Sequence, residues 1–151
     1  MTRYKFLLTK KDVEMWKLIK RTNHKILAIW AIDSAERVLR YFEEKYPEDR
    51  RPRVALETLQ KWIDIGVFKM AVIRKASLDA HAATRAAPLD SPARSAARAC
   101  GQAVATAHVA RHAYGPAIYA QQAIFRLTNS MDDVERERNW QYKHLLELKR
   151  S

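Results

Sequence analysis

The stretch Pro92–Tyr114, PARSAARACGQAVATAHVARHAY, decides the fold of this chain. Alanine has the highest helix propensity of all residues, so this alanine-rich run predicts one continuous helix. Ala97, Gly101 and Ala105 give that helix a face with almost no side-chain bulk, which allows neighbouring helices to approach closely. We therefore expect this helix at the centre of a bundle, capped at its C-terminal end by Gly115.

The rest of the chain predicts further helices on either side of this stretch. Apolar residues recur every three to four positions, and prolines, Gly66 and polar capping residues separate the periodic segments. The expected helices cover residues 9–22, 24–46, 52–65, 67–87, 116–128 and 130–150. Only three glycines are present, which disfavours sheets and their turns. The sequence predicts an all-α fold, a compact bundle of six to seven helices around the central alanine-rich helix, in a single domain of residues 1–151.

The composition is that of an ordinary globular protein, with 48% hydrophobic and 30% charged residues. No apolar run approaches the ~20 residues that span a bilayer, and the N-terminus lacks the pattern of a secretory signal. The single cysteine, Cys100, cannot form an intramolecular disulfide, and its alanine-rich surroundings predict a buried thiol. We expect a cytoplasmic protein with no membrane association.

The net charge of +11 is the strongest feature of the composition. Residues 1–25 carry eight basic and two acidic side chains. Such a field attracts acidic partners, among them nucleic acid and acidic proteins. No base-reading motif accompanies the charge, so a solvated basic face is the other interpretation.

His108 and His112 are spaced four residues apart, which would place both imidazoles on one side of a continuous helix. Zinc proteases use this spacing, but Val109 stands where their catalytic glutamate would be. His81 and Asp33 could complete a metal site if the bundle brought all four residues together. The alternative, which we prefer, is a set of hydrogen-bonded structural histidines with no bound metal.

Two further groups of residues are candidates for binding. Asp33 lies among apolar neighbours and needs a partner, which could be Arg37 one turn later or a basic residue of the alanine-rich helix. Arg50, Arg51 and Arg53 lie beside a predicted helix start, where guanidinium groups and backbone N–H groups suit an anion or an acidic partner. A solvated loop is the other interpretation of these arginines.

The sequence contains no recognisable catalytic motif. It has no G-x-S-x-G nucleophile elbow, no P-loop, no glycine-rich phosphate fingerprint and no C-x-x-C pair. We therefore predict that the protein is not an enzyme, with no catalytic residues and no cofactor.

Three segments resemble a bacterial family of immunity proteins that belong to polymorphic toxin systems. They are WAIDSAERVLRYFEEKYPEDRRPR (30–53), AHAATRAA (80–87) and SAARACGQAVATAHVARHAYGPAIYAQQAI (95–124), so the resemblance covers about residues 28–128. It implies an all-helical protein that binds and neutralises a cognate toxin through protein–protein contact, and it supplies no catalytic residues. In that family a cysteine often occupies the position of Ser34.

The positive charge restricts which toxin such a protein could bind. Like charges slow encounter and cost affinity, so a +11 protein would be repelled by a basic nuclease. We predict that the toxin is not a basic nuclease, or that the contact face is locally acidic or apolar. Small-residue helix faces could also meet across a homo-oligomer, which the sequence leaves open.

Overall fold

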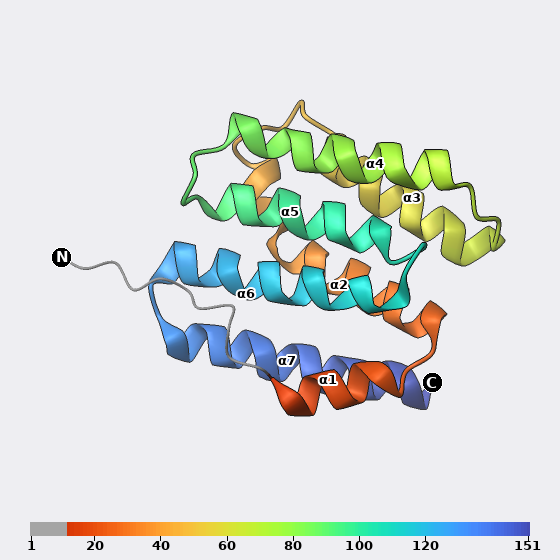
Figure 1. Cartoon of the computed structure of the whole chain (residues 1–151). Coiled ribbons are helices and arrows are strands. Elements are labelled where there is room, and N and C mark those ends of the chain that lie inside the picture. The colour runs from red at the N-terminus through yellow and green to blue at the C-terminus, as the bar shows by residue number, and fades with distance from the viewer. Residues whose placement is uncertain (1–11) are drawn as a thin grey trace.

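The computed structural model describes residues 12–151, and within that range the chain folds as the expected all-α bundle (Figure 1). The described residues form seven α-helices and two short 3₁₀ helices, and none of them forms a strand. The elements are α1 (Val13–Lys20), α2 (His24–Glu43), α3 (Arg51–Ile65), α4 (Met70–Ala83), η1 (Thr84–Ala86), α5 (Pro92–Ala105), η2 (Ala110–Ala113), α6 (Tyr114–Thr128) and α7 (Met131–Arg150). The predicted first turn at residues 9–11 lies outside the described residues.

Local capping residues explain where most of these helices begin. The side chains of Asp12, Asn23, Ser91 and Ser130 each accept a hydrogen bond from the backbone N–H three residues later. Each bond satisfies one of the N–H groups that a helix start leaves without a partner. Gly66 ends α3 in the left-handed conformation with φ +76°, as its position in the sequence predicted.

Helix α5 lies at the centre of the bundle, as expected. It packs against α2, α3, α4 and α6, and Figure 1 shows it between α4 and α6. Ala97 and Gly101 are buried, Ala105 is half-buried, and the Ser77 hydroxyl donates to the Gly101 carbonyl at 2.9 Å. A Cβ atom on Gly101 would lie 2.6 Å from Nε2 of His81, so any larger residue would require the imidazole to move. Small residues on α5 therefore allow the close packing.

The prediction of one continuous helix over residues 92–114 was wrong. Helix α5 ends at Ala105, a turn follows, and η2 leads directly into α6 (Figure 1). High alanine propensity is a local preference, and packing overrides it here because the reversal lays α6 alongside α5. Gly115, expected as the end of a helix, lies instead in the first turn of α6. Pro116, expected to open the next helix, also lies in that first turn, where its missing N–H is not needed.

The remaining core joins α2 to α6 and α7. Trp30 of α2 is fully buried and donates from Nε1 to the Gln141 carbonyl at 2.9 Å. The buried Gln141 side chain donates in turn to the Ala117 carbonyl at 3.0 Å. Within residues 12–151, no helix is both long enough and apolar enough to cross a membrane.

Candidate functional site

The structure does not bring the sequence-predicted site residues together. Asp33 lies at the contact between α2 and α7, His81 lies on α4, and His108 and His112 lie in the connection from α5 to α6. Because that connection is not a continuous helix, the two histidines do not share one helix face, and this prediction was wrong. Among the described residues, no group of three histidine, cysteine, aspartate or glutamate side chains could hold a metal ion.

Asp33 finds its partner on α7 rather than on the alanine-rich helix. His144 donates from Nε2 to Oδ2 of Asp33 at 2.7 Å. Arg37, the other expected partner, instead forms a bidentate pair with the buried Glu137, with Nε 2.7 Å from Oε2. The Arg37 guanidinium lies 3.7 Å from the ring centre of Trp140, which stacks on His144 at 4.6 Å. These contacts hold α7 against α2.

Sequence reasoning missed the three α7 residues of this cluster. Glu137, Trp140 and His144 are spaced three and four residues apart, so they lie along one side of α7. That spacing was the available signal, but it could not show that this side of α7 faces Asp33 and Arg37.

His81 and His112 also have structural partners. Arg98 donates to Nδ1 of His81 at 3.0 Å, and the imidazole lies against Gly101. Burial lowers the pKa of His81, and the positive charge of Arg98 lowers it further, so both favour the neutral ring. His112 contacts Oε1 of Gln102 through Nδ1 at 3.3 Å. Each of these two histidines therefore has a side-chain partner within the chain.

His108 and His24 make contacts between the start of α2, the end of α3 with the residues after it, and the residues after α5. His108 stacks on Phe68 of the α3–α4 connection, with ring centres 5.8 Å apart. His24, the first residue of α2, packs against Trp62 of α3 in a tilted arrangement, with ring centres 4.7 Å apart, and contacts the Thr106 carbonyl through Nε2. The start of α2, the end of α3 and the residues after α5 thus form one packed end of the bundle.

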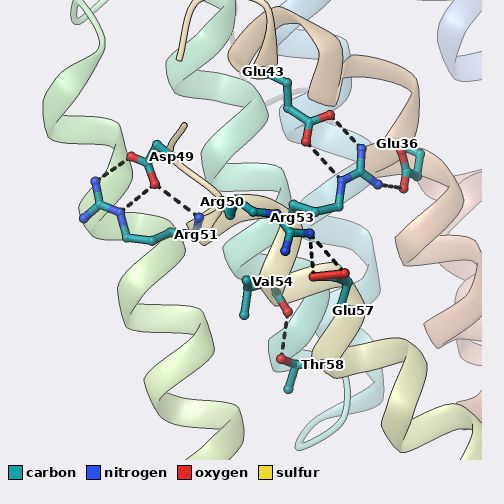
Figure 2. A network of polar contacts seen from close by, with 9 residues as sticks. All are labelled: Glu36, Glu43, Asp49, Arg50, Arg51, Arg53, Val54, Glu57 and Thr58. Atoms are coloured by element: carbon teal, nitrogen blue, oxygen red, sulfur yellow. Dashed lines mark hydrogen bonds and ion pairs between the residues drawn. The ribbon is translucent and has the colours of Figure 1, made fainter. Parts of the chain in front are cut away.

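The three arginines predicted to bind an anion all have carboxylate partners within the chain (Figure 2). The partners are Glu57 for Arg50, Asp49 for Arg51, and both Glu36 and Glu43 for Arg53. The hydrogen bond from Arg51 lowers the pKa of Asp49, which keeps that carboxylate charged. A cleft of about 600 Å³ lies beside the start of α3, lined by Glu48, Asp49, Arg50, Arg51, Val54, Ala76 and Asp79. The three arginines are already paired with carboxylates of the chain, so an external anion would have to compete with those partners. An anion site here stays a prediction.

An exposed apolar segment at the α3–α4 connection is the feature that sequence reasoning missed. Residues 64–72 are all exposed, and five of them are large hydrophobic residues with 38–59% of their surface exposed. We call these five residues the apolar patch: Ile65, Val67, Phe68, Met70 and Val72. Apolar periodicity in the predicted helix over residues 67–87 would place Val67 and Met70 on its buried face together with Ile73. In the structure Val67 precedes α4, Met70 is its first residue, and both side chains are exposed.

Within residues 12–151, the two ends of the bundle differ in the sign of their net charge. Successive helices reverse direction, so the α1–α2, α3–α4 and α5–α6 connections gather at the end that also holds the C-terminus (Figure 1). This basic end, formed by residues 20–25, 61–70, 106–113 and 147–151, carries eight basic and two acidic side chains. The opposite acidic end, formed by residues 43–51, 84–91 and 128–133, carries four basic and seven acidic side chains. The apolar patch lies at the basic end.

The fold and its surface define an all-helical protein whose candidate sites are contact surfaces, with no metal cluster in the described residues. The sequence profile of the family described as "Imm-5 like putative immunity protein" matches residues 17–148. The chain therefore belongs to this family. Neither the curated proteins nor the solved structures include a significant match to the chain.

Proposed function

We propose that this protein binds a cognate bacterial toxin and neutralises it through protein–protein contact in the cytoplasm. Membership of the immunity-protein family, over residues 17–148, is the observation that carries the proposal. The surface of the molecule supports it in two ways. An apolar patch is exposed at one end, and that end has a net charge opposite to the net charge of the other end. Exposed apolar surface on a globular protein commonly marks an interaction site.

Co-expression tests the proposal. Each open reading frame beside the gene in the native genome is expressed under an inducible promoter in a bacterial host, with and without this protein. We expect one of them to arrest growth alone and to be tolerated when this protein is present. A Leu59→Asp variant, which places a charge in the core where Leu59 is fully buried, is the control and should not protect. If no neighbouring product is toxic, or if none is neutralised, the proposal is wrong.

Nucleic-acid binding is a second candidate, favoured by the basic end. Trp16 of α1 is partly exposed next to this end, with the Lys20 ammonium 5.9 Å and the Arg111 guanidinium 5.6 Å from its ring. Phosphate contacts release counterions, so binding to a labelled DNA duplex should weaken steeply as salt rises from 50 to 200 mM. If no binding to the duplex is detected at 50 mM salt, where phosphate contacts are strongest, this candidate is ruled out.

A further inference from the structure

We infer that the apolar patch at the basic end is the surface on which the toxin docks, and that the complementary toxin surface has an apolar centre and an acidic margin. This inference rests on the proposed function, since it assigns the site where the neutralising contact is made.

The patch is exposed and yet held in place by the fold. Phe68 stacks on His108, and the left-handed Gly66 donates its N–H to the Trp62 carbonyl at 2.8 Å. Ile73, directly after the patch, is buried and anchors the first turn of α4. A connection fixed in this way loses little conformational freedom on binding, so apolar contacts made by it contribute more of their free energy to affinity.

The charges around the patch indicate the chemistry of the partner. Residues 60–75 carry four basic side chains and one acidic side chain, and the whole basic end carries eight against two. The basic residues nearest the patch in sequence are Lys61, Lys69, Arg74 and Lys75, and the acidic residue is Asp64. Lys75 pairs with Asp79 along α4. An acidic margin on the toxin would be attracted to this end over long range and would accelerate association.

The same charges disfavour the other occupants of the patch. A second copy related by a twofold axis would bring two basic ends together, and like charges across an interface cost affinity. Residues 1–11 of this chain carry four basic and no acidic side chains, so they are disfavoured for the same reason. Nucleic acid would match the charge, but four of the five patch residues are aliphatic or methionine, without the rings on which bases stack.

The test measures the affinity between the purified protein and the toxin that it neutralises, by isothermal titration calorimetry. Val67→Asp and Val72→Asp each place a carboxylate on the patch where the native side chain is more than half exposed. We expect each variant to weaken binding by at least about tenfold, because the new carboxylate removes an apolar contact and repels the acidic margin of the toxin. The control is Leu89→Asp, because Leu89 is also apolar and is 72% exposed but lies at the acidic end. It should bind within about twofold of wild type.

A second measurement tests the electrostatic part. Wild-type affinity should fall as salt rises, and Lys69→Glu should slow association more than Lys45→Glu, whose lysine lies at the acidic end. Circular dichroism of each variant must match wild type, which exposed substitutions should satisfy.

The outcomes separate this inference from the proposed function. If wild type neutralises the toxin but the Val67 and Val72 variants bind it as tightly, the toxin docks elsewhere and the inference is overturned. Light scattering that shows a wild-type dimer, made monomeric by Val67→Asp, would assign the patch to self-association instead. If wild type neutralises no toxin, the proposed function and the inference both fail.

Discussion

Replacing Gly101 with alanine tests how closely α4 and α5 approach each other. The added Cβ would lie 2.6 Å from Nε2 and 2.8 Å from two carbons of the His81 ring. An ordinary contact begins near 3.4 Å, so the imidazole must move by about 0.8 Å. Arg98 holds the other ring nitrogen at 3.0 Å, which limits that movement.

Two opposing contributions set the size of the effect. Alanine is favoured over glycine inside a helix by about 1 kcal/mol, which would stabilise α5. Overpacking of a close contact costs about 1–3 kcal/mol, which exceeds that gain over most of its range. We expect the Gly101→Ala variant to be less stable than wild type by about 1 kcal/mol. In a His81→Ala background, where the ring is absent, the same substitution should stabilise by about 1 kcal/mol.

Urea unfolding followed by circular dichroism, on wild type, both single variants and the double variant, measures this difference. The double-mutant cycle cancels the cost of removing the imidazole itself, so the remaining coupling free energy should be about 2 kcal/mol. For a chain of this length the shift in Tm between the two backgrounds should be about 4–8 °C. If Gly101→Ala changes stability by the same amount in both backgrounds, the close approach of His81 to Gly101 does not exist and the reasoning is wrong.

Four other substitutions or measurements test individual contacts. Ser34→Ala should raise the free energy of unfolding by about 1 kcal/mol in urea melts, because the buried Ser34 hydroxyl has no hydrogen-bond partner. Arg37→Ala should cost about 2 kcal/mol in the same assay, because it leaves the buried Glu137 carboxylate without its bidentate partner; a loss below about 0.5 kcal/mol would contradict this. Burial raises the pKa of the Cys100 thiol, so a thiol reagent at pH 8 should label it only as fast as the protein unfolds, and rapid labelling of native protein would show that it is accessible. Folding lowers the pKa of His81, so the unfolded chain takes up a proton more readily than the folded protein. The free energy of unfolding should therefore be unaffected by His81 above the pKa of the unfolded chain, near 6.5, and should decrease as the pH drops below it. His81→Ala should reduce the difference in urea midpoint between pH 7.5 and pH 5.5.

The sequence predicted the helices because their signals are local. Capping residues such as Asn23, Ser91 and Ser130 act within one turn, and the apolar stripe of α2 recurs at helical spacing. The break after Ala105 was not predictable in the same way. Alanine favours a helix on both sides of it, and the reversal depends on packing between α5 and α6 that no local pattern expresses.

Partners and exposed surfaces were harder to predict than helices. Asp33 was expected to need a partner and has one, but the choice of His144 depends on how α7 lies against α2, 111 residues away in sequence. The apolar patch was missed because periodicity assigned Val67 and Met70 to a buried face, whereas Val67 precedes α4 and Met70 is its exposed first residue. Periodicity assigns a residue to a helix face only if the residue lies within the helix, and helix boundaries are the least certain part of a prediction from sequence.

The tight reversal between α5 and α6 makes two extensively packed helices neighbours in sequence. Closing such a short loop costs little chain entropy, and contacts between nearby residues form before distant ones. We therefore expect this hairpin to assemble first during refolding, with α2 and α7 docking onto it afterwards. Substitutions inside the hairpin would then mainly slow refolding, whereas those between α2 and α7 would mainly accelerate unfolding.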